Sequence, residues 1–294
     1  MKGGQVSKLW RLCFQDNEAF IRLFFNKFYC SRRTFSVVQK GRVVSALQVL
    51  PYALTSPVDD TIFRLAYIAG CCTHPDYRGR GYMRRLLATA VAEAREQGFD
   101  LAALIPASTS LFDYYGALGF TTSCFFTHVT YLMDKPVADM AAHRFLRLNG
   151  HTAARFYPFF ARCFQQRKNC IQLNNLQFRA AVTDINLDDG AAYLLQKKSN
   201  GAPLALAFVL PTPPDTLHLP AIPYVKEIVA TDKIAGQTIL TYILKIYRTS
   251  TAICRTPLDR ADGFPAIPYG MTLPLSDRFS MGSKPGIYIN LMLD

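Results

Sequence analysis

The stretch YIAGCCTHPDYRGRGYMRRLL, residues 67–87, decides the fold of this 294-residue chain. It completes an apolar run over residues 62–73 that predicts a central strand. His74-Pro75 ends the strand, because proline cannot donate a hydrogen bond to a sheet. From Met83 to Ala94 apolar side chains recur at helical spacing, which predicts an amphipathic helix that stops at Gly98. A strand, a loop and a helix are therefore expected in succession.

The loop Arg78–Met83, RGRGYM, has the composition of an anion-binding site. Glycines let backbone amides approach a ligand closely, and a helix start adds unpaired N–H groups and partial positive charge. Arg78 and Arg80 add formal charge. Neither the Walker A pattern nor the Rossmann fingerprint is present. We therefore expect a phosphate or pyrophosphate here, with a solvated glycine turn as the alternative.

Elements of both kinds surround this core. Residues Gln15 to Tyr29 have helical apolar spacing, and two β-branched runs flank Lys40-Gly41 as in a hairpin. A buried strand at Leu101 to Ile105, a short helix closed by Gly119, and strands from Thr121 to Met133 follow the central helix. The order predicts an α/β fold of the mixed-sheet, α+β kind, with at least one parallel crossover.

The pattern recurs beyond Asp134-Lys135-Pro136, which we interpret as a boundary between residues 1–135 and residues 136–294. The recurring elements are a hairpin turn, a strand, a helix and a strand, at Asn200-Gly201, Tyr224–Ala230, Lys233–Tyr247 and Thr249–Cys254. Their similar spacing favours a duplicated unit over chance recurrence. The second unit is degenerate, because VATDKIAG (residues 229–236) has no Arg-Gly-x-Gly. Asp232 there would repel a pyrophosphate and suits a helix N-cap.

Composition narrows the class of protein. Half of the residues are hydrophobic and 18% are charged, which excludes a disordered chain. No apolar run has the length of a membrane helix or a signal peptide. The eight cysteines form no CxxC and the five histidines show no ligand spacing, so we expect reduced thiols, no metal and a cytoplasmic protein. The net charge of +12 is compatible with an anionic partner, whether a nucleotide, a nucleic acid or a membrane surface, and does not choose between them.

One segment carries much of this positive charge. Residues 140–183 contain no acid, and aromatic rings interleave there with Arg144, Arg147, Arg155, Arg162, Arg167, Lys168 and Arg179. A nucleic-acid surface has this composition. An amphipathic helix with a basic solvated face has it too, and we favour that interpretation because no nucleic-acid-binding signature accompanies it.

The segment 67–87 resembles motif A of the GNAT acetyltransferases, whose pattern is R/Q-x-x-G-x-G/A. The stretch IPASTSLFDYYGALGF, residues 105–120, is similar to the family's late segment ending Tyr-x-x-x-Gly-Phe. The resemblance covers about residues 1–135. The layout in two halves resembles the Eis-like (enhanced intracellular survival) acetyltransferases, without their third domain.

The resemblance implies acetyl-CoA as cosubstrate and no metal. Its pyrophosphate would bind the loop, with contacts from Arg78, Gly79, Arg80, Gly81, Tyr82 and Met83. The pantetheine arm would run along the strand end Cys71-Cys72-Thr73, which in the family splays from its neighbour, and Ser108 would touch the cofactor at the next strand.

The same resemblance assigns Tyr115 as general acid, with Tyr114 as the adjacent alternative. The general base is less defined: Eis-like enzymes use their C-terminal carboxylate, here Asp294, and a water relay or a substrate arriving as free amine competes with it. We expect an N-acetyltransferase acting by direct attack of a primary amine, on a small molecule or peptide. The alternative is a non-catalytic CoA-binding module with an anionic partner, such as nucleic acid, on residues 144–179. We expect no membrane partner, and a homo-oligomer stays open.

Overall fold

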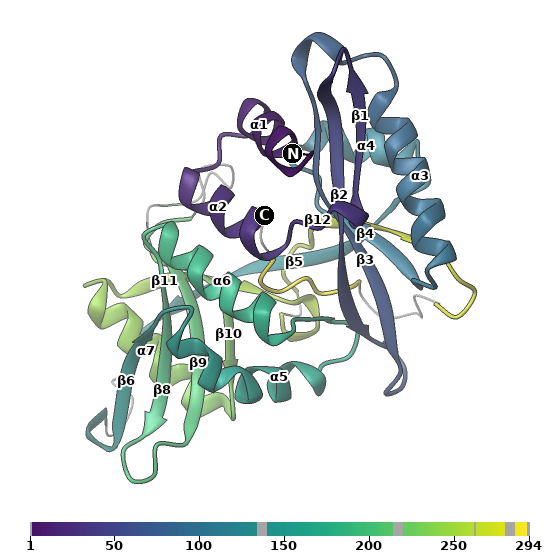
Figure 1. Cartoon of the computed structure of the whole chain (residues 1–294). Helices are drawn as coiled ribbons and strands as arrows, with labels where there is room; N and C mark the ends of the chain where they lie inside the picture. The colour runs from purple at the N-terminus through teal and green to yellow at the C-terminus, as the bar shows by residue number, and fades with distance from the viewer. Residues whose placement is uncertain are drawn as a thin grey trace.

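The computed structural model describes residues 2–133, 140–213, 220, 222–261, 263–279 and 286–292 (Figure 1). The helices of the first half are α1 Lys2–Cys13, α2 Glu18–Lys27, α3 Tyr82–Glu96 and α4 Thr109–Gly116. Its strands are β1 Thr34–Gln39, β2 Arg42–Thr55, β3 Ile62–Thr73, β4 Leu101–Leu104 and β5 Thr121–Leu132.

The second half adds helices and strands in a similar order. The helices are α5 Tyr157–Gln165, α6 Asn175–Leu187 and α7 Lys233–Ile246. The strands are β6 His143–Leu148, β7 Ile171–Gln172, β8 Ala191–Lys197, β9 Pro203–Leu210, β10 Tyr224–Ala230, β11 Thr251–Thr256 and β12 Ile267–Pro274. Short 3-10 turns stand at Ser31–Arg33, Pro75–Tyr77, Met140–Ala142, Thr152–Phe156 and Leu258–Arg260.

The strands described here form one mixed sheet in the order β1-β2-β3-β4-β12-β5-β11-β10-β9-β8-β6, with β7 beside β2. The pairs β3–β4 and β10–β11 are parallel, and the other named pairs are antiparallel. The expected α/β fold with a mixed sheet is confirmed.

The sheet contains the predicted duplication. The hairpin β1–β2, strand β3, helix α3 and strand β4 recur as the hairpin β8–β9, strand β10, helix α7 and strand β11. Each unit closes with one parallel crossover, β3–α3–β4 and β10–α7–β11. The helix expected at Gln15 to Tyr29 is the shorter α2, and the strands expected from Thr121 to Met133 are the single strand β5.

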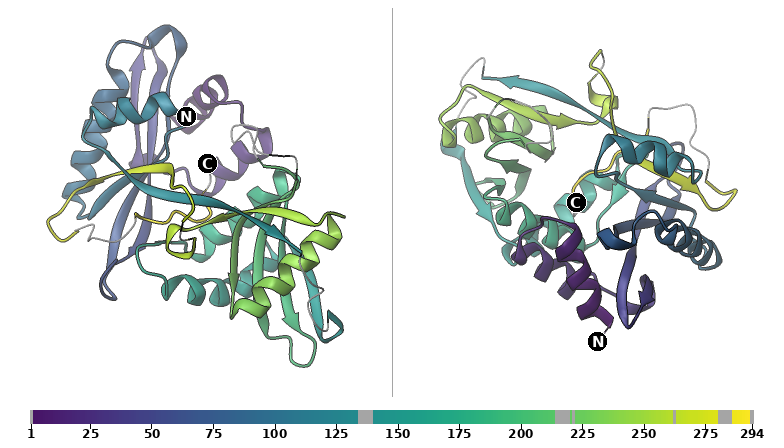
Figure 2. Two further views of the ribbon diagram at one scale, coloured as in Figure 1. Left: turned by 180° about the vertical axis from the view of Figure 1, so that it is seen from behind. Right: turned by 90° about the horizontal axis from the view of Figure 1, so that it is seen from above.

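The two units share strands rather than ending at a clean border. Strand β5 pairs with β12 along residues 121–126 and with β11 along residues 127–132. Strand β12, from the C-terminal part, inserts between β4 and β5 of the first unit, so that β5 crosses from one unit to the other (Figure 2). The expected boundary at Asp134-Lys135-Pro136 lies outside the described residues.

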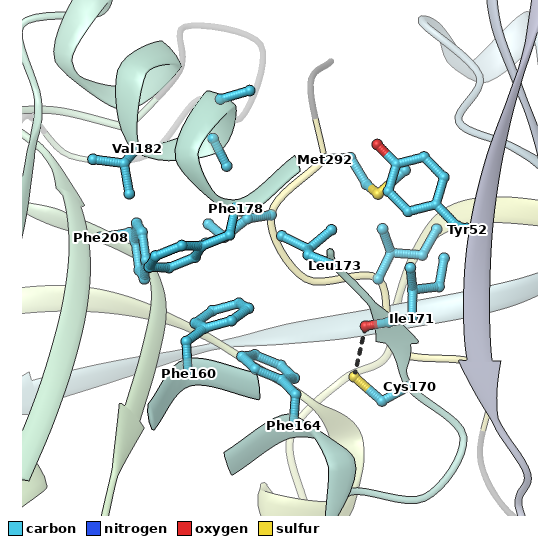
Figure 3. Close-up of a cluster of buried hydrophobic side chains, with 14 of the residues drawn as sticks. Tyr52, Phe160, Phe164, Cys170, Ile171, Leu173, Phe178, Val182, Phe208 and Met292 are labelled. Carbon is cyan, nitrogen blue, oxygen red and sulfur yellow. Dashed lines mark hydrogen bonds between the residues drawn. The ribbon is translucent and has the colours of Figure 1, made fainter. Parts of the chain in front are cut away.

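Helices cover both faces of the sheet. Helix α3 packs on β1, β2 and β3, and α1 packs on the other face of β2 and β3. A large apolar core joins the units: Phe160 and Phe164 of α5 and Phe178 of α6 lie in it with Tyr52 of β2 and Met292 near the C-terminus (Figure 3). None of the described helices is both long and apolar enough to cross a membrane.

Candidate active site

The loop before α3 has a backbone that glycine allows. Gly79 and Gly81 have φ values of +74° and +71°, in the left-handed region that other residues rarely adopt. Gly81 is the N-cap of α3 and provides no side-chain cap. Apart from the glycine and its two chain neighbours, no described residue has an atom within 4 Å of the position that a Cβ would take at either glycine. The loop thus leaves the first amides of α3 beside open space.

Two arginines are fixed around this loop by hydrogen bonds to backbone carbonyls. Arg78 Nε donates to the carbonyl of Thr73 at 3.2 Å, and Arg80 Nη2 donates to the carbonyl of Asp76 at 2.9 Å. The Arg80 guanidinium also stacks on the Tyr77 ring at 5.0 Å. Both side chains are exposed, and their positive charges lie on the same pocket as the start of α3.

Strand β3 continues well beyond its partner β4. The two strands pair only through Leu65–Tyr67 and Leu101–Ala103, although β3 extends to Thr73. None of the described strands pairs with the edge of residues 68–73 that faces β4. Such an edge can accept an extended, amide-bearing ligand in the way that a sheet accepts another strand.

Loop and strand edge border one pocket of about 780 Å³. It brings together every residue expected to bind the cofactor, which are Cys71, Cys72, Thr73, Arg78, Gly79, Arg80, Gly81, Tyr82, Met83 and Ser108. Tyr114 and Tyr115 of α4 and Cys13 of α1 also line it. We refer to this space as the loop pocket.

Tyr115 is buried, at 6% exposure, whereas Tyr114 beside it is exposed at 37%. Burial, and then the neighbouring Cys71, raise the pKa of the Tyr115 phenol well above its ordinary value. Burial likewise raises the pKa of the Cys71 thiol to about 12, against a hydrogen bond with Tyr115. Both groups consequently stay protonated at neutral pH.

A second pocket of about 370 Å³ adjoins the loop pocket, and we call it the aromatic pocket. Its lining includes Trp10, Phe14, Asp16, Phe20 and Tyr67. Four residues line both spaces, namely Phe14, Cys71, Leu111 and Tyr115. Tyr115 therefore stands where the two pockets meet, and Tyr114 lines only the loop pocket.

One carboxylate lines the aromatic pocket, and none of the described residues that line the loop pocket is acidic. The Trp10 indole Nε1 donates to Asp16 Oδ2 at 2.6 Å, which holds that carboxylate in place. Gly70 lets the indole lie against β3: it has φ +60°, and a Cβ there would stand 2.1 Å from Trp10 Cζ3. The arrangement offers aromatic faces and a fixed negative charge, which suits a cation.

Sequence comparison assigns the first part of the chain to a family. A family model described as an acetyltransferase (GNAT) domain matches residues 4–123. This part of the chain belongs to the GNAT acetyltransferase superfamily. The matched GNAT segment contains the loop, the strand β3 and Tyr115. No curated protein matches the chain in sequence.

Solved structures extend the GNAT likeness over most of the chain. A probable N-acyltransferase from Enterococcus faecalis has a TM-score of 0.70 at 13% identity, over 93% of this chain and 70% of that one. Eis1 from Mycobacterium abscessus has a TM-score of 0.68 at 12% identity, over 94% and 72%. A tandem GNAT protein of clavulanic acid biosynthesis has a TM-score of 0.51 at 16% identity, over 93% and 95%. These likenesses establish the tandem GNAT fold.

The second GNAT-like unit has a different helix start. Asp232 is the N-cap of α7, and its Oδ1 accepts from the amide of Ala235 at 2.8 Å, which confirms the expected cap. The Asp232 carboxylate thus caps the amides at the start of α7, whereas the corresponding amides of α3 have no side-chain cap. Asp294, expected as a base, lies outside the described residues.

Sequence reasoning missed the aromatic pocket. Trp10 belongs to α1, a helix that we did not expect, and Asp16 lies in the connection after α1, where we expected the helix from Gln15 to begin. The chain's single tryptophan, six residues before an aspartate, was the signal present there. The Trp10 indole lies against Gly70, which is sixty positions away in the sequence. No local sequence pattern predicts this contact.

Proposed function

We propose that this protein transfers an acetyl group from acetyl-CoA to a primary amine by direct attack, without an acyl-enzyme. The observation that carries the proposal is the junction of the two pockets. Tyr115 and Cys71 border both the loop pocket, which suits a CoA-like anion, and the aromatic pocket, which suits a cation. Two substrates bound in these spaces would meet at the Tyr115 hydroxyl.

The residues of the loop pocket fit acetyl-CoA, which supplies the activated acetyl group when bound. Open amides at the start of α3 and the charges of Arg78 and Arg80 suit its pyrophosphate. The unpaired edge of β3 suits its amide-bearing arm. A volume of about 780 Å³ is within the range of pockets for small ligands.

Tyr115 acts as the general acid in this proposal. Burial raises the pKa of its phenol, so the hydroxyl holds its proton at neutral pH. At the pocket junction it can donate that proton to the leaving sulfur as the acetyl group moves to the amine. Cys71, which is half-buried beside it and has a pKa of about 12, is no nucleophile at neutral pH.

The acceptor is proposed to be a cationic primary amine. Asp16 attracts its ammonium group, and the rings of Trp10, Phe14 and Phe20 surround its carbon frame. The Trp10 indole keeps the carboxylate at one side of the pocket. The terminal carboxylate of Asp294 stays a prediction as general base.

The test is release of free thiol from acetyl-CoA in the presence of a panel of primary amines. Tyr115→Phe should lower kcat by roughly 10²–10⁴-fold and leave CoA affinity unchanged, because it removes only a proton donor. Tyr131→Phe, on β5 outside both pockets, is the matched control. CoA binding without turnover on any amine would contradict the proposal and favour the non-catalytic module with an anionic partner on residues 144–179.

A further inference from the structure

The acid-free basic segment does not form one charged surface. Several of its cations have partners within the chain: Arg147 donates to the carbonyl of Gly190 at 2.8 Å and Arg179 to that of Gly150 at 2.9 Å. Lys168 pairs with Asp60 at 2.8 Å. Arg162 and Arg167 behave differently, because both line a further pocket beside α5.

This α5 pocket, of about 630 Å³, is bordered by Arg162, Cys163 and Arg167, by Arg260 from the turn Leu258–Arg260, and by the end of β10. None of the described residues that line it is acidic. All three arginines act on the Cys163 thiol: burial raises its pKa, and the three positive charges oppose that rise. The three arginines therefore bring their positive charge to the border of one pocket.

Arg167 is built into this site rather than lying on the surface. It is 8% exposed, and its guanidinium lies between the Phe164 ring at 5.4 Å and the Tyr288 ring at 4.8 Å. Its buried Nη1 has no hydrogen-bond partner among the described residues. Neither Glu227 nor Asp259, the acids whose charge acts on it, forms an ion pair with it in the described structure. A buried donor without a partner is costly and is commonly satisfied by a bound group.

The α5 pocket lies at the C-terminal end of β10, as the loop pocket lies at the C-terminal end of β3, but none of its described lining residues belongs to α7. Strand β10 pairs with β11 only through Tyr224 and Val225, and its end at Val229 and Ala230, which pairs with β9 alone, borders the α5 pocket. Strand β3 borders the loop pocket in the same way, beyond its pairing with β4. Because Asp232 caps α7, arginine side chains are the donors available here in place of helix amides.

We propose that the α5 pocket binds the phosphate group of a small molecule, independently of the acetyl-transfer site. Guanidinium groups match phosphate and carboxylate oxygens, but three of them approaching from different positions suit the tetrahedral oxygens of a phosphate better than a planar carboxylate. Asp259 borders the adjoining smaller pocket, so the three arginines keep an excess of positive charge.

The test is titration of the full chain with pyrophosphate at constant ionic strength, followed by calorimetry. Because the loop pocket also suits this probe, the titration is made with acetyl-CoA at saturation and repeated with Arg80→Ala. Binding should persist in both arms. The double variant Arg162→Ala/Arg260→Ala should weaken it at least about tenfold, since it removes two charge-assisted partners. Both side chains are exposed, so folding should survive.

Arg144→Ala is the matched control, because Arg144 is an exposed arginine of β6 in the same basic segment and does not line the α5 pocket. The proposal is overturned if neither the native chain saturated with acetyl-CoA nor the Arg80→Ala variant gives binding heat with pyrophosphate. It is also overturned if the double variant binds pyrophosphate as tightly as the native chain does. Binding that Arg80→Ala abolishes would place the probe at the loop pocket and overturn it too. Tighter binding of citrate than of pyrophosphate would overturn the choice of phosphate.

Discussion

At the scale of single residues, Asp16 is the carboxylate of the aromatic pocket and the Trp10 indole fixes it at 2.6 Å. Asp16→Asn should raise KM for a cationic amine roughly tenfold and leave CoA affinity unchanged, because it removes a charged partner of the ammonium only. Steady-state kinetics and CoA titration measure the two effects. Asp113→Asn on α4 is the control, since that exposed acid lines neither pocket. Equal KM in Asp16→Asn and the native enzyme would remove Asp16 from substrate binding.

Cys13 provides a pH-dependent probe of the loop pocket. A hydrogen bond from Cys72, helped by the positive charge of Arg78, lowers the pKa of the Cys13 thiol to about 7. Only the thiolate is alkylated, so the rate at Cys13 should rise with pH through 7 and level off above about 8. Iodoacetamide labelling with mass spectrometry measures it, and CoA should protect the residue because Cys13 lines the loop pocket. A rate that still climbs at pH 9, or no protection by CoA, contradicts this prediction.

At the scale of elements, a comparison of Gly79 with Gly41 distinguishes the effect of backbone strain on stability from an effect of the loop on ligand binding. Gly79 and Gly41 both have φ +74° with no atom within 4 Å of a built Cβ, but Gly41 turns the β1–β2 hairpin and lies outside the loop pocket. Alanine at either position should lower the free energy of unfolding by about 1 kcal/mol. Gly79→Ala alone should weaken CoA binding, by calorimetry. Equal CoA affinities in the two variants would mean that the loop does not hold the cofactor.

Sequence predicted the elements whose signals are local. The β3–loop–α3 stretch, both hairpin turns, β10 and α7 stand where apolar periodicity, glycine and Asp232 placed them. Strand β12 was missed because Pro268 and Gly270 weaken its strand pattern, and its pairing with β4 and β5 decides it. Helix α6 was missed although Asn174 and Gln177 form a capping box, a signal that the sequence contained.

At the scale of the whole molecule, β5 and β12 make the two units one sheet. Ser123 of β5 and Thr272 of β12 share a buried hydrogen bond of 2.7 Å between their hydroxyl groups. Ser123→Ala should lower the free energy of unfolding by about 1–3 kcal/mol, because the Thr272 hydroxyl loses its partner. Hydrogen exchange should then accelerate in β3 and in β10 by the same factor.

Thr130→Ala is the control for that experiment, since Thr130 is an exposed residue of the same strand. Faster exchange in β3 with unchanged exchange in β10 would show that the units unfold separately. The division into residues 1–135 and 136–294 would then describe two cooperative bodies after all.

The candidate sites follow the same division between local and distant information. The loop residues and Tyr115 lie within one stretch, so motif spacing alone indicated them. The aromatic pocket needs α1 against β3, and the α5 pocket needs Arg260 beside Arg167, more than ninety positions earlier. The order of strands in the sheet produces these long-range contacts. No periodic pattern in the sequence predicts them.

The close seating of Trp10 on Gly70 has a practical consequence. The chain has one tryptophan, and its indole borders the aromatic pocket while donating to Asp16. Its fluorescence emission therefore originates from a single place in the molecule. An amine that drew Asp16 away from the indole would change the emission of Trp10. Binding in the aromatic pocket can therefore be followed in the native chain without any attached dye.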